Sequence, residues 1–163
     1  MAVVNHEFSP VYQEDSAVLI LGTIPSPKSR EYGFYYSHPQ NRFWKVMAYL
    51  FQEEMPASRE DRLQFVLCHK IALWDVLARC EIAGAADSSI RNETPNDLSI
   101  ILKGASIKQI YTTGKKADAL YRKHCYPILQ RESICLPSTS PANCACSFER
   151  LVKAYSQILT YCE

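Results

Sequence analysis

Two loops of the sequence carry residues that could bind phosphates and planar ligands. The first covers residues 22–40 and opens with Gly22, Thr23, Ile24, Pro25 and Ser26. A glycine lets a ligand approach the backbone closely, and hydroxyl groups can donate to phosphate oxygens. Its second half is rich in aromatic side chains, which offer stacking surfaces to a planar base. The alternative is that the bulkiest of these rings belong to the core and that the tyrosines only cover it.

The second loop covers residues 136–143 and packs three hydroxyl side chains and two prolines between a strand and a helix. Its central residues are Pro137, Ser138, Thr139 and Ser140. Hydroxyls and free backbone N–H groups could grip phosphates here. An ordinary connection is the alternative, because Ser, Thr and Pro are common turn formers. Two such loops at matching ends of parallel strands favour a ligand site more than either loop does alone.

Alternating strands and helices must position these loops. Apolar runs predict buried strands at residues 17–21, 71–77, 107–112 and 133–136. Helical periodicity and capping residues predict helices at 43–51, from Ser58, from Thr94 to 104, after Gly114 and from Ser147 to 159. The alternation predicts an α/β fold, a three-layer α/β/α sandwich with a mostly parallel four-stranded central sheet, in one domain over residues 1–163. Ligands bind such sheets beyond the carboxyl ends of their strands, where both loops lie.

Composition narrows the class of protein. The chain has 163 residues and 47% hydrophobic residues, enough for a core without a metal or disulfide. No apolar run could cross a bilayer and the first ten residues do not read as a secretory signal, so we expect a cytoplasmic protein. The seven cysteines include no Cys-x-x-Cys pair. We expect free, mostly buried thiols and neither metal nor cofactor; an iron–sulfur cluster held by distant cysteines is the alternative.

Charge is neutral on the whole but unevenly spread. The net charge is +1, yet residues 103–131 hold seven Lys or Arg and one acid, Asp118. A basic face of this kind can follow a phosphate backbone. A solvated helix face explains the same residues equally well.

The order of motifs resembles a known family. Gly22-x-x-Pro25 after the first strand, paired with Pro137-Ser138 after the last, resembles the uracil-DNA glycosylase superfamily. Residues 22–44 resemble its hypoxanthine-DNA glycosylase branch, and so, in the same order, do residues 73–77, 96–98, 113–117 and 136–142. Each string alone is weak, whereas the ordered set is specific and covers most of the chain.

The resemblance implies a DNA-repair enzyme that hydrolyses the N-glycosidic bond of a deaminated base and leaves an abasic site. Many members of the superfamily place Asp or Asn where this chain has Ile24, which can neither position water nor stabilise a cation. The branch has an Asn before Phe-Trp, so Asn41 inherits the catalytic role, orienting a water toward C1′. Asn41 could instead serve as the N-cap of the helix that follows it.

The same resemblance implies the base and its contacts. Leu136 stands where uracil-specific relatives often have His, which favours a deaminated purine, hypoxanthine, flipped out of the duplex. Either Tyr35 or Tyr36 would stack on the base. The implied base-binding residues are Gly22, Thr23, Ile24, Pro25, Tyr35, Tyr36 and Phe43. The implied DNA-binding residues are Ser26, Ser29, Lys115, Pro137, Ser138, Thr139 and Ser140.

Three alternatives remain open from sequence. We expect Asp75, which follows a buried Trp, to satisfy backbone or cap groups, although a carboxylate could stabilise a sugar cation. The chain could be a nucleic-acid or nucleotide-binding module on the same fold, since Ile24 and Leu136 depart from the superfamily pattern. An enzyme on free nucleosides is disfavoured by the hydroxyl-rich second loop and the basic stretch. Under the main hypothesis the partner is DNA with a damaged base, bound by a monomer.

Overall fold

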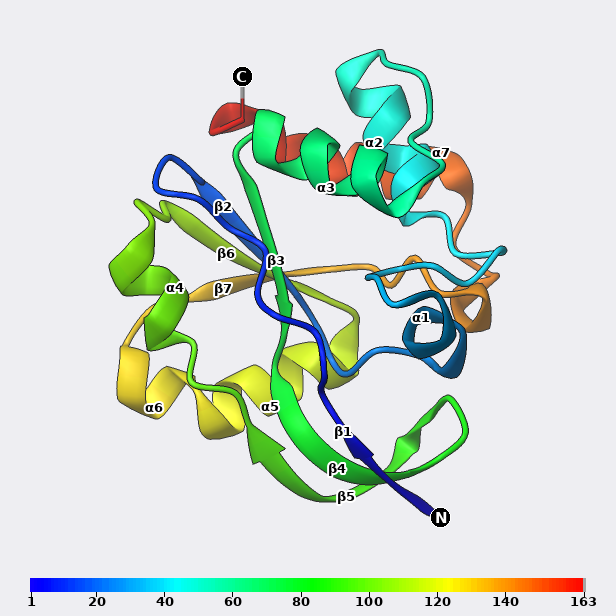
Figure 1. The fold of residues 1–163 in the computed structure, drawn as a ribbon, viewed down its shortest axis with the longest axis vertical. Helices are drawn as coiled ribbons and strands as arrows, with labels where there is room; N and C mark the ends of the chain where they lie inside the picture. The colour runs from blue at the N-terminus through cyan, green and yellow to red at the C-terminus, as the bar shows by residue number, and fades with distance from the viewer. Residues whose placement is uncertain (163) are drawn as a thin grey trace.

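A central parallel sheet organises the molecule. The computed structural model describes residues 1–162. Its main sheet has the strand order β3 (Ile71–Asp75), β2 (Val18–Gly22), β6 (Gln109–Thr113), β7 (Ser133–Leu136), and every neighbouring pair is parallel (Figure 1). β2 lies second in this order, and all five residues of both β2 and β3 are buried. The predicted α/β class and the four-stranded sheet are therefore confirmed.

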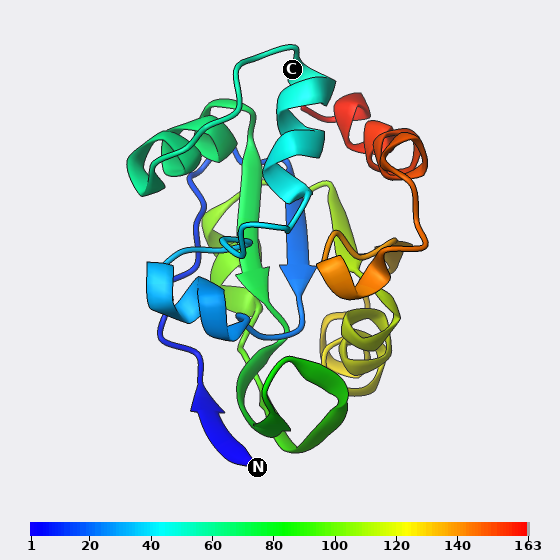
Figure 2. The same ribbon diagram turned by 90° about the vertical axis from the view of Figure 1, so that its right-hand side faces the viewer.

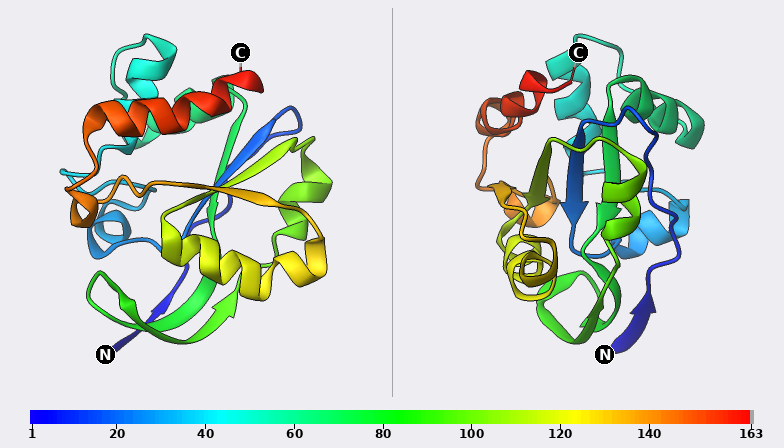
Figure 3. Two further views of the ribbon diagram at one scale, coloured as in Figure 1. Left: turned by 180° about the vertical axis from the view of Figure 1, so that it is seen from behind. Right: turned by 90° about the vertical axis from the view of Figure 1, so that its left-hand side faces the viewer.

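Helices cover both faces of this sheet. α2 (Phe43–Phe51), α3 (Arg59–Cys68) and α7 (Phe148–Tyr155) gather on one side. α4 (Ser99–Gly104), α5 (Lys115–His124) and α6 (Tyr126–Leu129) lie on the other (Figure 3). This is the predicted three-layer arrangement.

Side-chain caps begin several helices where the sequence indicates. Ser58 Oγ accepts from the N–H of Asp61 at 3.0 Å, and Ser147 Oγ accepts from the N–H of Arg150 at 3.2 Å. α2 spans the predicted residues 43–51, and α7 continues as the 3₁₀ helix η2 (Ser156–Thr160). The first loop contains a short helix that was not predicted, α1 (Pro27–Tyr32).

A second, antiparallel sheet was missed by the sequence analysis. It has the order β1 (Ala2–Asn5), β4 (Leu77–Ala83), β5 (Ala86–Pro95). The prediction of a helix starting at Thr94 is wrong, because Thr94 pairs with Arg79 of β4 and the helix begins only at Ser99. All ten residues of β5 are half-buried or exposed, and the segment lacks the apolar alternation that reveals a strand.

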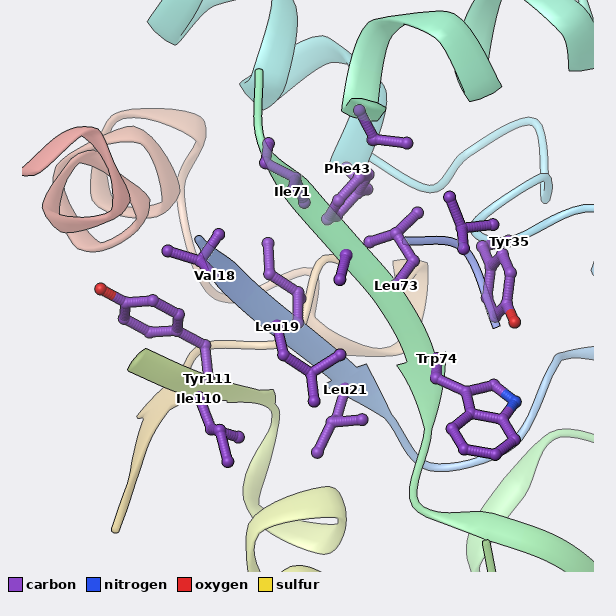
Figure 4. Packing of buried hydrophobic residues seen from close by; sticks show 14 of the residues in the cluster. Val18, Leu19, Leu21, Tyr35, Phe43, Ile71, Leu73, Trp74, Ile110 and Tyr111 are labelled. Atoms are coloured by element: carbon purple, nitrogen blue, oxygen red, sulfur yellow. The ribbon is translucent and has the colours of Figure 1, made fainter. Parts of the chain in front are cut away.

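The core takes in most of the aromatic residues of the first loop and of the start of α2 that follows it. Phe43 and Trp44 are buried, and the Trp44 indole N–H donates to the carbonyl of Tyr35 at 3.2 Å. Figure 4 shows Tyr35 beside β3 with Trp74, inside the buried cluster. The alternative that the bulkiest of these rings belong to the core is therefore confirmed.

The cysteines, the possible metal ligands and the lengths of the helices can each be compared with the predictions. All seven cysteines are free, as expected, but only Cys80, Cys125 and Cys162 are buried, so "mostly buried" is wrong. Within residues 1–162, no three His, Cys, Asp or Glu side chains gather as metal ligands would. Nor does any described helix have the length and apolar character needed to span a membrane.

Candidate active site

The carboxyl ends of the four parallel strands bring the two predicted loops to one edge. The strand register places Gly22 opposite Asp75, and Thr113 opposite Leu136. In Figure 2, β2 and β3 run toward this edge between α1 on one side and the turn at residues 141–146 on the other. The edge therefore collects Gly22, a buried carboxylate and both hydroxyl-rich loops.

Gly22 is required by the protein's own packing. A Cβ at this position would collide with Oδ1 of Asp75, and it would lie 3.4 Å from the hydroxyl of Tyr36. The carboxyl end of β2 thus touches the Asp75 carboxylate directly. The group that closely approaches the Gly22 backbone in this structure is therefore the Asp75 side chain.

Asp75 pairs with a residue that sequence reasoning did not consider. Its Oδ2 lies 2.7 Å from Nε2 of His6, and the two side chains are 5% and 2% exposed. The expectation that the Asp75 carboxylate satisfies backbone or cap groups is therefore wrong. No sequence signal marks His6, which reaches the site because β1 pairs with β4. The sequence signal for Asp75 was its place directly after the buried Trp74, and the structure makes it the last residue of β3.

Tyr36 stands at the site, whereas Tyr35 does not. The Tyr36 ring stacks on Phe43 with centroids 4.1 Å apart and an interplanar angle of 12°. Its hydroxyl is buried without a hydrogen-bond partner among the described residues, and burial together with the nearby Asp75 raises its pKa. Tyr35 instead donates from its hydroxyl to the carbonyl of Ser9 at 2.9 Å, inside the core.

Asn41 lies one residue before the N-cap of α2 and keeps further hydrogen-bonding capacity. Its Oδ1 accepts from the N–H of Phe43 at 2.9 Å, at the start of α2. A carbonyl oxygen has two lone pairs and the amide nitrogen carries two N–H groups, so one acceptor position and both donors remain. The alternative that Asn41 is the N-cap is wrong, because Arg42 holds that position without a side-chain capping bond. The bond to Phe43 leaves the Asn41 amide able to bind a water.

Arg42 joins the two loops. Its backbone N–H donates to the carbonyl of Thr139 at 3.1 Å. Its guanidinium donates to the carbonyls of Cys146 at 2.6 Å and Asn143 at 3.1 Å. The second loop is thus fixed directly to the segment that carries Asn41.

The second loop is built by its own hydroxyls. Ser138 Oγ accepts from the N–H of Ser140 at 3.1 Å, and Ser140 Oγ accepts from the N–H of Ala142 at 3.2 Å. These two backbone N–H groups are therefore engaged, and the serine O–H groups remain able to donate to a ligand. Thr139 is buried, and the carbonyl of Pro137 accepts from the Tyr155 hydroxyl at 2.7 Å.

The first loop uses its serines mainly for structure. Ser26 Oγ caps α1 by accepting from the N–H of Ser29 at 3.1 Å. Ser29 is buried, and its Oγ accepts from the N–H of Ser37 at 3.0 Å. Thr23 and Pro25 are buried beside the sheet edge, and Ile24 is half-buried. Ser29 thus lies behind the surface where a phosphate would bind.

Two arginines of the basic stretch are engaged by other groups of the protein. Arg122 pairs with Asp118 at 3.0 Å, and Arg131 donates to the carbonyl of Ile107 at 2.9 Å. Lys115 differs, because it is exposed at the start of α5 and follows Gly114, where an added Cβ would lie 3.2 Å from the Cβ of Ser138. Lys115 is therefore the basic residue of this stretch that the structure places beside the second loop.

Comparisons with known proteins show the family of this chain. Residues 9–159 match the model of the uracil DNA glycosylase superfamily. The chain is 34% identical over 112 residues to a protein named hypoxanthine DNA glycosylase from Methanosarcina barkeri, covering 68% of this chain and 71% of that one. A protein of the same name from Methanosarcina acetivorans is 32% identical over 146 residues, covering 86% and 89%.

A solved structure shares the whole fold. It is a solution NMR structure from Methanosarcina acetivorans, described as a candidate uracil DNA glycosylase. The two share a TM-score of 0.83 and 28% sequence identity, covering 98% of this chain and 99% of that one. The chain therefore belongs to the uracil DNA glycosylase superfamily, whose DNA glycosylases are hydrolases that act on DNA.

Proposed function

We propose that this protein removes hypoxanthine from DNA as a monofunctional glycosylase. The observation that carries the proposal is the hydrogen bond from the Arg42 N–H to the Thr139 carbonyl. It holds Asn41, the residue assigned to the chemistry, next to the loop assigned to the phosphates. The names of the two Methanosarcina relatives support hypoxanthine as the base.

The chemistry is hydrolysis at C1′ of the sugar. The bond from C1′ to the base breaks, its electron pair leaves with the base, and the sugar becomes cation-like. The remaining lone pair of Asn41 Oδ1 accepts from a water molecule and orients its oxygen toward C1′. The Asn41 amide is too weakly basic to remove the water's proton. The water therefore loses its proton as the new C–O bond forms, and the departing nucleobase takes up a proton.

The base is expected to lie against Phe43 at the sheet edge. Phe43 already has a planar partner, because Tyr36 stacks on it. A base flipped out of the duplex offers the same kind of surface. Leu136 is fully buried at the end of β7 and has no polar group for a uracil oxygen, which is consistent with a purine substrate.

The flanking phosphates are expected at the second loop. The hydroxyls of Ser138 and Ser140 remain able to donate, and exposed Lys115 supplies a positive charge. Hydroxyl and Lys contacts to phosphates position a protein on DNA without reading its sequence. The buried Ser29 is left out of this contact set.

The test is excision from a duplex oligonucleotide that carries one deoxyinosine. We expect strand breaks at the lesion after alkali treatment, and none without alkali, because a monofunctional enzyme leaves the abasic strand intact. Duplexes with xanthine, uracil or ethenoadenine measure the breadth of activity. Lesion binding without strand breaks above the blank would instead support the alternative, a binding module on the same fold. Competition by undamaged DNA, but not by free deoxyinosine, would separate a DNA enzyme from a nucleoside hydrolase.

A further inference from the structure

A groove between α2 and the start of α7 lies next to the second loop, and the proposed chemistry does not use it. Its volume is about 550 Å³. The residues that line it come from α2, from the two positions after α2 and from the start of α7: Lys45, Ala48, Tyr49, Gln52, Glu53 and Phe148. Figure 2 shows the two helices above the turn at residues 141–146, which belongs to the same side of the molecule.

Lys45 supplies a positive charge at the end of the groove nearest the second loop. Its Nζ lies 4.8 Å from the centroid of the Phe148 ring, a cation–π contact that holds the ammonium group over the ring. The Lys45 side chain is exposed, and it forms no ion pair with any of residues 1–162. Its charge is therefore available to an anionic ligand.

Two aromatic rings give the groove an apolar wall beside this charge. The ring of Tyr49 meets that of Phe148 edge to face, with centroids 5.7 Å apart and an interplanar angle of 90°. Tyr49 is 63% exposed, so much of its ring is open to a ligand. Aromatic rings beside a cation suit a nucleic-acid strand, in which phosphates alternate with less polar sugars and bases.

The negative charge of the groove lies at its other end. Among the lining residues that the structure describes, Glu53 is the one with a carboxylate, and it follows the last turn of α2. Its Oε2 lies 2.5 Å from Nε2 of His69, at the end of α3. The end of the groove beside the second loop is therefore the end that favours an anion.

The groove is continuous with the loop assigned to the phosphates. Arg42 donates from its backbone N–H to the carbonyl of Thr139, and from its guanidinium to the carbonyls of Asn143 and Cys146. Lys45 lies three residues after Arg42 on the same face of α2, about 4.5 Å further along the helix axis. A DNA strand rises about 3.4 Å per nucleotide, so one strand can reach both the second loop and Lys45.

We propose that this groove binds the damaged strand beside the flipped nucleotide, with Lys45 on one phosphate and the rings of Tyr49 and Phe148 against the adjoining sugar. This inference rests on the proposed glycosylase function and adds to it a DNA contact outside the base site. A lysine binds a phosphate as a point charge and does not read the sequence. The groove therefore contributes to affinity for any strand that carries the lesion.

The first arm of the test measures the charge. The probe is a duplex with one tetrahydrofuran residue, a stable analogue of the abasic site, and its dissociation constant is measured over a range of salt concentrations. Lys45→Gln keeps most of the side chain without its charge. We expect binding to weaken about threefold to tenfold, and the slope of log K against log salt to become shallower by about 0.9, the loss of one phosphate contact. Lys103→Gln is the control, because Lys103 is exposed on α4, which precedes β6 at the opposite end of the sheet. A wild-type slope in Lys45→Gln would overturn the inference.

The second arm locates the phosphate. The phosphates on both sides of the tetrahydrofuran residue are replaced, one at a time, by neutral methylphosphonates. We expect one replacement to weaken binding by wild type about threefold to tenfold and to have no further effect in Lys45→Gln, because the two changes remove the same contact. Lys103→Gln should keep the full effect. Equal effects in wild type and Lys45→Gln at every position would contradict a contact between Lys45 and the strand.

The third arm measures the aromatic wall. We expect Tyr49→Ser to weaken binding about threefold without changing the salt slope, because the lost contact carries no charge. Ile128→Ser is the control, since Ile128 is 80% exposed on α6, which precedes β7 at the opposite end of the sheet. Thermal unfolding of each variant checks that the fold is kept. Binding by Tyr49→Ser at the wild-type strength would show that the ring does not contact the strand.

The outcomes separate this inference from the proposed function. If wild type excises hypoxanthine while Lys45→Gln keeps the wild-type affinity and salt slope, the inference is wrong and the proposed function stands. If wild type excises none of the deaminated bases, the proposed function fails, whatever the affinity of Lys45→Gln.

Discussion

The N–H of Phe43 donates a 2.9 Å hydrogen bond to Oδ1 of Asn41, so the side chain assigned to the chemistry also orders the turn that leads into α2. A serine hydroxyl can accept from the same kind of backbone N–H but has no amide, and alanine has neither group. We expect the free energy of unfolding of Asn41→Ser to lie within about 0.5 kcal/mol of wild type, and that of Asn41→Ala to fall by about 1 kcal/mol. Both should excise hypoxanthine at least about a hundredfold more slowly.

Urea unfolding and single-turnover excision, measured on the same samples, check this separation of roles. Lesion binding should survive in Asn41→Ser, because a side-chain oxygen that accepts from the Phe43 N–H is kept. Excision by that variant at the wild-type rate would show that the amide is not needed.

Gly22 and Asp75 should be coupled in stability. Gly22 has no left-handed backbone, so the cost of Gly22→Ala lies in the collision between the new Cβ and the Asp75 carboxylate. We expect a loss of about 1–3 kcal/mol in the free energy of unfolding. In an Asp75→Ala background the collision partner is absent, and the same substitution should cost less. Equal costs in both backgrounds, measured by urea unfolding, would contradict the contact.

The sequence identified the elements that carry strong local signals. The apolar stripe predicted α2 at residues 43–51, and the capping serines Ser58 and Ser147 lie where helices begin. The short apolar run at residues 17–21 predicted β2, which begins and ends one residue later, at Val18–Gly22. These signals are local, because periodicity and capping depend on residues a few positions apart.

The sequence could not reveal contacts made across the chain. His6 and Asp75 lie 69 residues apart, and nothing near either one indicates the other. The hairpin of β4 and β5 is mostly solvated, and Thr94-Pro95 imitated a helix start because the same residues suit a strand end. Asp75 was noted from sequence, but its role depends on which strand lies beside it.

The two adjacent tyrosines should differ in what their hydroxyls contribute. Tyr35 donates to Ser9 at 2.9 Å, whereas the Tyr36 hydroxyl has no partner in the described part of the chain. We expect Tyr35→Phe to lose about 1 kcal/mol and Tyr36→Phe to be neutral or slightly stabilised. Thermal unfolding of the two variants checks the contrast. A larger loss in Tyr36→Phe would show that its hydroxyl is satisfied in solution.

Glu93 should make the free energy of unfolding depend on pH in the acid range. Hydrogen bonds from Lys123 and from its own backbone N–H lower its pKa from 4.5 to about 2. A carboxyl group whose pKa is lower in the folded state stabilises the fold at pH values above its unfolded pKa. That stabilisation is lost as the pH falls through its folded pKa. The contribution should be present at neutral pH and disappear between pH of about 4.5 and 2. The free energy of unfolding of wild type should therefore exceed that of Glu93→Gln by about 1 kcal/mol at pH 7 and by little at pH 2. Glu54→Gln, exposed after α2, is the control in urea unfolding.

Arg42 should couple the two loops in activity as well as in stability. Its guanidinium binds the carbonyls of Cys146 and Asn143, and Arg42→Ala would leave both without these donors. We expect a loss of about 1–3 kcal/mol in unfolding free energy, and weaker binding of the lesion duplex because the serine loop is no longer fixed. Arg42→Lys restores charge but cannot reach two carbonyls with a planar fork, so it should recover only part of both. Arg150→Ala, which removes an exposed charge on α7, tests whether charge alone sets DNA affinity. If Arg150→Ala weakens binding as much as Arg42→Ala does, the loop connection is not what holds the DNA.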